Sequence, residues 1–264
     1  MLFRSLRPSA AEARDRVNAD LHFHILPGID DGPSDLAESL ELARAAVAEG
    51  TSVVVATPHV RLDLGTTDTR EIAERTAELQ GELARAGIPL ELRCGGELGD
   101  HVVGRLTQSE LERLAQGPAG SRWLLVETPF HGLGADFHAA TAELRERGFG
   151  VLLAHPERSA DATLDGCAGL RRELEAGSLA QLNAPSLTGG HGEEVRAAAW
   201  SLVESGYVAV IGSDAHGPTR PPALGAAREA LTASGAEAMA DEYIRAAPRR
   251  LLESGIRPRA AVSA

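Results

Sequence analysis

Short, nearly continuous apolar runs recur along the chain and alternate with amphipathic segments. Runs such as VVVAT, WLLVE and VLLAH lack a polar face, which is typical of strands buried on both sides in a parallel sheet. The predicted strands span residues 20–24, 52–57, 90–94, 123–126, 150–153, 179–182 and 207–211. Strands that alternate with helical segments at this spacing predict right-handed βαβ units and an α/β fold.

The segments between these runs carry apolar residues at helical spacing, and many of them end at glycine. The first has Ser34 as a candidate N-cap and Gly50 as a stop signal. The predicted helices span residues 35–49, 69–86, 109–115, 136–147, 164–176, 193–204 and 222–234. The pattern fits a closed barrel or an open doubly wound sheet, and no Gly-rich fingerprint follows the first strand to favour a nucleotide-binding sheet. We expect residues 1–18 to be an extension and residues 19–264 to form one domain.

The composition excludes several kinds of chemistry. All 26 basic residues are Arg, so lysine Schiff bases, lysine general bases and the P-loop lysine are excluded. A net charge of −12 argues against a nucleic-acid partner, because phosphate neutralisation needs a basic surface. The two cysteines, Cys94 and Cys167, form no disulfide framework, and neither begins a Cys-x5-Arg loop. Since no signal-peptide core or membrane-spanning run is found, we expect a cytoplasmic protein.

Metal-ligand side chains cluster where the predicted strands end. Strand residues alternate faces, so His22 and His24 point to the same side, as do Asp214 and His216. In a barrel the carboxyl ends of the strands converge on one face, where active sites form. The candidate ligands are His22, His24, Asp31, His59, Glu97, Glu127, His155, Asp214 and His216. Imidazole and carboxylate together suit zinc, manganese or iron, and nine ligands suit two or three clustered ions.

Each of these residues taken alone has an ordinary structural explanation, since a single strand-end histidine is more often a satisfied polar residue than a ligand. The remaining histidines are expected on the surface, and they are His101, His131, His138 and His191. His131 is the strongest exception, because it follows the fourth strand on the side of the site. Asp20 shares a face with His22 and is expected to orient a ligand. Cys94 is expected to be a small buried apolar residue, and Arg171 and Arg172 a solvated helix face.

These residues lie in motifs that resemble those of the polymerase-and-histidinol-phosphatase (PHP) superfamily. Within it, the sequence resembles the bacterial metal-dependent tyrosine phosphatases of capsule and exopolysaccharide systems. The motifs, over about residues 19–235, are HILPGIDDG, VVATPH, GGEL, VETPF, LLAHPER, QLNAPSLTG and SDAH. HILPGIDDG followed by HPER and SDAH is highly specific for this subgroup, and histidinol phosphatases lack the DDG stretch in this form. The resemblance implies a distorted TIM-like (β/α)7 barrel with a trinuclear metal centre.

The resemblance also implies roles for individual residues. One ion would be held by His22, His24 and Asp214, a second by Glu127 and His155 with Glu97 bridging the two, and a third by Asp31, His59 and His216. Manganese is our first choice of metal, with iron or zinc as alternatives. Arg158 and Arg220 match catalytic, phosphate-binding arginines, and the alternative for Arg158 is an ion pair with Glu157 or another acid. The segments at 60–63 and 98–101 depart from the common basic versions, which leaves the exact substrate open.

The implied reaction is phosphomonoester hydrolysis without a covalent enzyme intermediate. Three divalent ions, four carboxylates and one hydroxide leave a centre of about +1, and a metal-bridging hydroxide attacks phosphorus in line. The implied substrate is a phosphotyrosine protein, for example the tail of a membrane-associated tyrosine kinase. Tyrosine is a good leaving group, and no general acid stands out in the sequence. The alternatives are a small-molecule phosphatase acting on histidinol phosphate or a sugar phosphate, and a non-catalytic PHP module.

Overall fold

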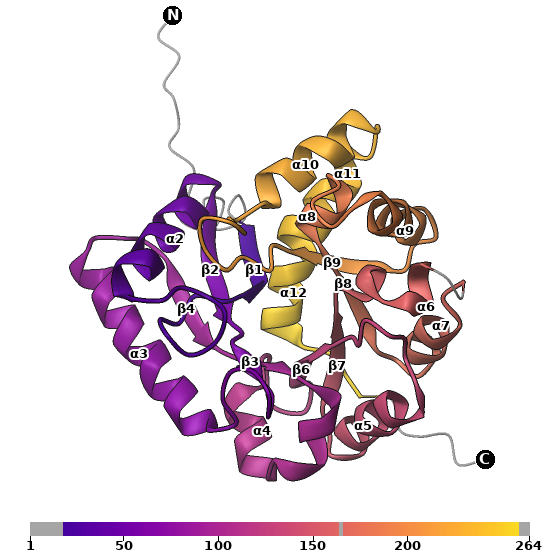
Figure 1. Ribbon diagram of the computed structural model, residues 1–264, viewed down its shortest axis with the longest axis horizontal. Coiled ribbons are helices and arrows are strands. Elements are labelled where there is room, and N and C mark those ends of the chain that lie inside the picture. Colours follow the sequence, from indigo (N-terminus) through magenta and orange to yellow (C-terminus); the bar gives the residue numbers. More distant parts are fainter. Residues whose placement is uncertain (1–17, 164–165, 259–264) are drawn as a thin grey trace, which may run out of the picture.

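The computed structural model describes residues 18–163 and 166–258. Parallel strands lie at the centre and helices surround them, so the predicted α/β class is confirmed (Figure 1). Asn18 begins the first strand, and the rest of the predicted extension, residues 1–17, lies outside the described residues. The boundaries of the predicted single domain stay a prediction.

Each of the seven predicted strands is present within a residue or two of its expected bounds, and two further strands of two residues each, at 59–60 and 97–98, were not predicted. The strands are β1 (Asn18–Phe23), β2 (Thr51–Ala56), β3 (His59–Val60), β4 (Glu91–Cys94), β5 (Glu97–Leu98), β6 (Trp123–Glu127), β7 (Gly150–Ala154), β8 (Leu179–Asn183) and β9 (Val208–Gly212). They form a three-stranded sheet in the order β1-β2-β4 and a six-stranded sheet in the order β3-β5-β6-β7-β8-β9. All of these pairs are parallel, as the buried apolar runs predict.

The two sheets continue into one another along the chain. Only two residues separate β2 from β3, and only Gly95 and Gly96 separate β4 from β5. A Cβ atom at Gly95 would lie 2.5 Å from Val55 Cγ1, so a residue without a side chain is required at this crossing. At the far edge, Phe23 and Ala215 form a parallel bridge next to the end of β9. Closure of the sheets into a barrel stays a prediction.

Helices follow most strands and pack around them (Figure 1). They are α2 (Leu36–Ala48), α3 (Thr69–Arg85), α4 (Gln108–Leu114), α5 (Ala135–Glu146), α6 (Ala160–Thr163), α7 (Ala168–Glu175), α8 (Ala184–Leu187), α9 (Glu193–Glu204), α10 (Leu224–Ala233), α11 (Glu237–Asp241) and α12 (Ala247–Ser254). Two 3-10 helices, η1 (Asp100–Arg105) and η2 (Pro156–Arg158), and a π-helical turn, η3 (Glu242–Ala246), complete the described part of the chain.

Two local predictions about helix starts are wrong. Asp35, not Ser34, caps α2, because its side chain accepts the Glu38 backbone N–H. The helix predicted over 164–176 begins only at Ala168, after Cys167 in a left-handed conformation (φ 64°). The Asp161 carboxylate accepts the N–H groups of the following turn, at Gly169 (2.8 Å) and Leu170 (2.9 Å), and therefore fixes this later start.

The C-terminal helices were not predicted, although α12 closes part of the core. An apolar cluster made of β1, β6, β7 and β9 side chains is completed by Leu251, Leu252 and Ile256. The indole N–H of buried Trp123 donates to the Leu251 carbonyl at 2.9 Å, which fastens α12 to β6. This packing leaves the carboxyl ends of the strands, where the polar residues gather, free of α12.

Candidate metal centre

The nine predicted ligands come together in the structure. Four overlapping groups place one ligand atom of each member within 4.8 Å of the others. The groups are His24, Asp31, His59 and His216; His22, Glu97 and His155; His22, His24 and Asp214; and His59, Glu97 and Glu127. These groups contain the nine predicted residues and no others. The predicted convergence of strand ends is therefore correct, while the binding of ions by these residues stays a prediction.

The grouping differs in detail from the division that the resemblance implies. Glu127 lies with His59 and Glu97 rather than with His155, which instead joins His22 and Glu97. The register of the six-stranded sheet explains why His59 and Glu97 share a group with Glu127, because His59 of β3 lies directly opposite Glu97 of β5. His22, His24, His59 and Glu97 each belong to two groups, and of these Glu97 alone has the two carboxylate oxygens that suit a bridging ligand.

The imidazoles of His22 and His24 are oriented by partners that the sequence analysis missed. His22 Nδ1 donates to Gln181 Oε1 at 2.9 Å, and His24 Nδ1 donates to Asp30 Oδ2 at 2.8 Å. Both Nε2 atoms therefore present lone pairs to the interior, only 3.2 Å apart. Two converging lone pairs repel each other unless a proton or a cation lies between them. Outer partners that fix the tautomer in this way are typical of metal-ligating histidines.

Asp30 also shapes the loop that carries Asp31. Its Oδ2 accepts the His59 backbone N–H at 2.9 Å, and its Oδ1 accepts the Gly32 N–H at 3.0 Å. A Cβ atom at Gly32 would lie 3.0 Å from Asp30 Oδ1 and 3.1 Å from the His24 carbonyl oxygen, so the turn has little room for a side chain. The two aspartates of the DDG stretch therefore have different roles: Asp30 holds the loop by hydrogen bonds, and Asp31 faces the other ligands.

Two of the nine residues sit in a strained backbone conformation. His155 (φ 37°) and Asp214 (φ 52°) both occupy the left-handed region, which non-glycine residues seldom adopt. Each follows directly or closely after a strand, β7 and β9 respectively, where a sharp turn aims the side chain back at the site. Such strain persists only where the surrounding structure enforces it, and it is concentrated at functional sites.

The donor set fits metal ions. Four atoms of the nine predicted ligands are buried without a hydrogen-bond partner: His59 Nδ1, Glu97 Oε2, His155 Nδ1 and His216 Nε2. A buried polar atom without a partner destabilises a fold, and such atoms are usually paired with protein or water. Imidazole nitrogens and carboxylate oxygens are also the ligands that divalent manganese, iron and zinc accept. Ions held by this cluster would give partners to Glu97 Oε2 and His216 Nε2, which lie against other ligand atoms.

The charges of the site favour ionised carboxylates. Burial opposes ionisation of Asp214, but His22, His155 and His24 outweigh it and hold the pKa of Asp214 well below its usual range. Burial likewise opposes protonation of His24, yet its hydrogen bond with Asp30 and the nearby Glu97 carboxylate raise its pKa to about 10. The cluster thus keeps negative charge available for cations, and an ion bound by His24 would displace its proton.

The two predicted arginines converge on one carboxylate. Arg158 Nη1 lies 3.2 Å and Arg220 Nη2 3.1 Å from Asp214 Oδ2, and Arg220 Nη1 also reaches Asp31 Oδ2 at 3.2 Å. Glu157 does not pair with Arg158, since its Oε1 accepts the Asn183 N–H and the Ser186 hydroxyl. The alternative of an ion pair with Glu157 is therefore wrong, but Arg158 does pair with another acid, Asp214. The phosphate-binding role of the two arginines stays a prediction.

A cavity of about 490 Å³ lies beside these arginines. Arg158, Asp214 and Arg220 form its polar side, and Pro185 and Pro221 belong to its apolar side. His191, which is partly exposed, also lines it. Burial and then the nearby Arg158 lower the pKa of His191 to about 4. Its Nδ1 lies 3.0 Å from Ser186 Oγ, which fixes the ring at the wall of the cavity.

The other secondary predictions have mixed outcomes. His101 and His131 are exposed as expected, whereas His138 is buried and lies 2.6 Å from Glu173 Oε1. Asp20 acts on the backbone, because it accepts the N–H groups of His22 (3.2 Å) and Ser213 (3.1 Å), and burial raises its pKa to about 6. Cys94 is half-buried against the core, and Arg171 and Arg172 are exposed as predicted.

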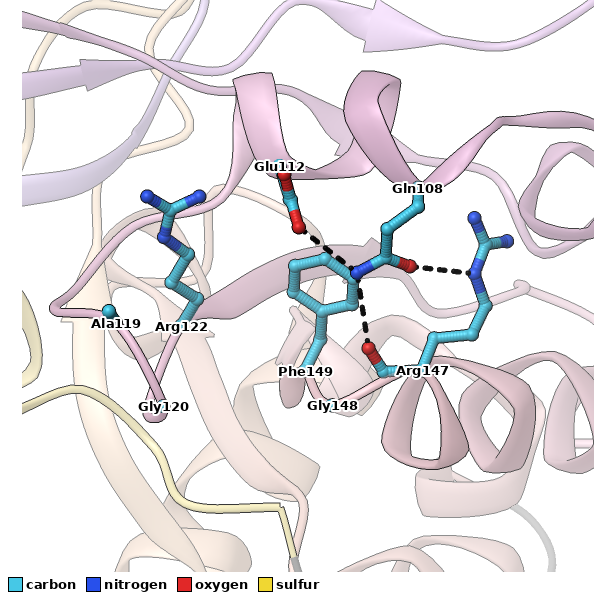
Figure 2. Close-up of a pocket in the computed structure, with 8 residues that line it drawn as sticks. All are labelled: Gln108, Glu112, Ala119, Gly120, Arg122, Arg147, Gly148 and Phe149. Carbon is cyan, nitrogen blue, oxygen red and sulfur yellow. Dashed lines mark hydrogen bonds between the residues drawn. The ribbon is translucent and has the colours of Figure 1, made fainter.

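A second cavity, of about 290 Å³, holds none of the predicted site residues. Figure 2 shows Phe149 at its floor, with Gln108 hydrogen-bonded to Glu112 and Arg147, and Arg122 to one side. Arg122 and Phe149 directly precede β6 and β7, so this cavity lies at the amino ends of the strands. The candidate metal centre therefore lies at the other end of the sheet.

The sequence matches the family model described as capsular polysaccharide synthesis, CpsB/CapC, over residues 18–253. The chain belongs to this family. The tyrosine-protein phosphatase YwqE of Bacillus subtilis (strain 168) is 31% identical over 197 residues, which cover 75% of this chain and 76% of that protein. The tyrosine-protein phosphatase CpsB of Streptococcus pneumoniae is 25% identical over 241 residues, which cover 88% and 97%. The predicted resemblance is confirmed.

Solved structures agree with this assignment. A crystal structure from work on YwqE of Bacillus subtilis and CpsB of Streptococcus pneumoniae, described as unique metal-dependent tyrosine phosphatases, matches with a TM-score of 0.78. It is 26% identical and covers 93% of this chain and 100% of its own. An Escherichia coli phosphotriesterase homology protein shares the fold at 13% identity, with a TM-score of 0.58. In the described part of the chain, every helix is too short or too polar to cross a membrane.

Proposed function

We propose that this CpsB/CapC-family chain is a metal-dependent phosphatase that hydrolyses phosphotyrosine in proteins. The observation that carries the proposal is the assembly of nine ligand-type residues into overlapping groups, one of whose members, Asp214, contacts two arginines. Its relatives YwqE and CpsB are named tyrosine-protein phosphatases, which supports this function over the small-molecule alternative.

The nine residues are proposed to hold three divalent ions, with manganese as the first choice and iron or zinc as alternatives. Such ions, when bound, lower the pKa of a coordinated water to about 7 and withdraw charge from the phosphoryl group. Glu97 is proposed to bridge two ions, because it lies in two of the four ligand groups and, unlike the histidines that also do so, offers two carboxylate oxygens. The outer partners Gln181 and Asp30 keep the Nε2 atoms of His22 and His24 turned inward.

Arg158 and Arg220 are proposed to bind the phosphoryl oxygens. Both guanidinium groups already reach the same carboxylate oxygen, so an anion that takes the place of this contact would receive donors from two directions. Phe130 lies beside this position, because Arg158 Cζ is 4.9 Å from the centre of its ring. The ring is 53% exposed and offers an apolar surface next to the phosphate-binding groups, which suits an aromatic phosphoester.

The finer predictions extend this proposal. We propose a phosphorylated tyrosine kinase tail as the substrate and a cytoplasmic location for the reaction. We also propose that the two sheets form a distorted barrel of seven βα units, which the continuation of β2 into β3 and of β4 into β5 supports. The bridge between Phe23 and Ala215 supports closure at the remaining edge.

The test is phosphate release by manganese-loaded protein from phosphotyrosine, phosphoserine and phosphothreonine peptides and from histidinol phosphate. We expect the phosphotyrosine peptides to be hydrolysed most efficiently. The variants His155→Ala and His216→Ala should lose activity and retain the circular dichroism spectrum of the wild type. Full turnover by these variants would exclude the metal mechanism, and a preference for histidinol phosphate would exclude the protein substrate.

A further inference from the structure

Arg61 contacts the candidate metal centre from outside the set of nine ligands. It follows β3 in the loop after His59, and its side chain reaches across to the end of β6. Arg61 Nη1 donates to Glu127 Oε2 at 2.6 Å. The Glu127 side chain is only 9% exposed and that of Arg61 is 26% exposed, so solvent screens this contact only in part.

The opposite edge of the same guanidinium group is held by Asp63. Arg61 Nε donates to Asp63 Oδ1 at 3.0 Å, and Nη2 donates to Asp63 Oδ2 at 2.8 Å. Since the Asp63 side chain is 63% exposed, this ion pair contributes little to stability. Two parallel hydrogen bonds nevertheless fix the orientation of the planar guanidinium group, so its remaining edge points in a fixed direction. That edge faces Glu127.

Gly99 leaves the space through which Arg61 passes. A Cβ atom at Gly99 would lie 2.7 Å from His101 Cε1 and 3.1 Å from Arg61 Cγ. The backbone at Gly99 (φ −67°) is one that any residue adopts, so the lack of room, and not conformation, disfavours a side chain there. The Leu62 N–H also lies 3.4 Å from His101 Nε2, which ties the loop to η1. The neighbouring chain is thus arranged around the extended Arg61 side chain.

We propose that Arg61 is a positioning residue that fixes the Glu127 carboxylate for metal binding. This inference rests on the proposed metal centre. A carboxylate offers about four lone-pair sites, so Glu127 can accept Arg61 and still bind an ion. The oxygen that accepts Arg61, Oε2, lies 4.0 Å from His59 Nδ1, on the side of the group that Glu127 forms with His59 and Glu97. Arg61 therefore orients Glu127 at the edge of the cluster.

Two effects of Arg61 on a bound ion oppose each other. Its positive charge repels a cation, whereas its hydrogen bond removes the rotational freedom that Glu127 would lose on binding. The carboxylate lies between the two positive charges and shields them from each other, so we expect the second effect to dominate. Removal of outer partners of metal ligands typically costs about 10- to 100-fold in metal affinity.

The experiment measures manganese stoichiometry and affinity by elemental analysis and by titration of metal-free protein. Arg61→Gln is expected to weaken the most weakly bound ion by about 10- to 100-fold, and Arg61→Lys to recover part of this loss because it keeps the charge. Gly99→Ala perturbs the same contact without touching either charged group and should weaken binding in the same direction. Arg93→Ala is the matched control, because Arg93 is a half-exposed arginine that pairs with Glu91 on β4.

Activity separates positioning from direct substrate binding. If Arg61 positions Glu127, the kcat of Arg61→Gln falls at limiting manganese and recovers when manganese is in excess, while KM changes little. Unchanged or tighter manganese binding by Arg61→Gln overturns the inference, as does a raised KM that excess metal does not restore. Glu127→Ala distinguishes the two proposals: if wild type and Glu127→Ala bind the same amount of metal, the proposed metal centre itself fails at this residue.

Discussion

Removal of Arg158 or Arg220 should reduce phosphatase activity by an amount that the structure allows us to work out. Both guanidinium groups reach Asp214 Oδ2, at 3.2 and 3.1 Å, so each has one donor already directed at the opening of the centre. A hydrogen bond to a charged group contributes about 1.5–3 kcal/mol. Loss of one such contact to the phosphoryl group corresponds to about a 10- to 150-fold decrease in kcat/KM.

The two arginines should not contribute equally. The Arg158 side chain is 21% exposed and that of Arg220 is 38% exposed, so water competes less with contacts made by Arg158. We expect Arg158→Ala to lie near the upper end of this range and Arg220→Ala near the lower end. The double variant should lose less than the product of the single losses, because the two groups share one partner and each responds to removal of the other.

The assay is kcat/KM for a phosphotyrosine peptide with manganese-loaded protein, and the matched control is Arg172→Ala on the exposed face of α7. Metal content is measured for each variant, because both arginines also contact Asp214. Arg158→Lys should recover little activity, since lysine keeps the charge and loses the planar fork. If both single variants keep more than about a third of wild-type kcat/KM with unchanged metal content, the assignment of these arginines to the phosphoryl group is refuted.

Three further predictions follow from the site and the packing. Glu173→Gln should destabilise the fold by about 3–5 kcal/mol in urea unfolding at pH 7, because it leaves Arg145, 11% exposed, without its buried counter-charge. Burial opposes ionisation of Glu173, but His138 and Arg145 outweigh burial and lower the pKa of its carboxyl group. The ionised carboxylate therefore stabilises the fold fully above a pH of about 4.3, and this stabilisation should vanish as the pH falls through the lowered pKa. A loss of unfolding free energy in Glu173→Gln that is as large at pH 3 as at pH 7 would contradict this. Phe130→Ala should lower kcat/KM for phosphotyrosine peptides about 2- to 10-fold more than for phosphoserine peptides, and equal losses would exclude an aromatic contact. Chelation of the metal should lower the melting temperature, because ions that bind only the folded state stabilise it, and an unchanged melting curve would count against the proposed centre.

The sequence was sufficient to predict which residues meet at the candidate centre. Parallel strands deliver their last residues to one edge, so a histidine or acid at the end of each strand becomes a neighbour of the others whatever the exact registers are. This is why His59, Glu97 and His155, far apart in the chain, were correctly expected together. The prediction needed only the position of each strand end, and those positions are visible in the apolar pattern.

The supporting residues could not be predicted in the same way. Gln181 orients His22 from 159 residues away, and His138 pairs with Glu173 from 35 residues away. Both contacts depend on which faces of neighbouring elements meet, and a glutamine or histidine in a single sequence carries no mark of its partner. Asp30 offered a signal, since it stands next to Asp31 in a turn, but its hydrogen bonds to His24 and to the His59 N–H are visible only in the structure. The start of helix α12 also had a signal in the sequence, because Pro248 is a favourable residue in the first turn of a helix.

We expect bound ions to stabilise the folded site as well as to supply its chemistry. The carboxyl ends of the strands gather four acids, two strained residues and four unpaired buried atoms, each of which destabilises the fold on its own. The apolar cluster closed by α12 does not depend on ions for its stability, because its contacts are made among hydrophobic side chains. Loss of metal should therefore loosen the loops after β1, β7 and β9 before it affects β6 or α12. Amide hydrogen exchange of metal-free protein should then show faster exchange in those loops and unchanged protection around Trp123.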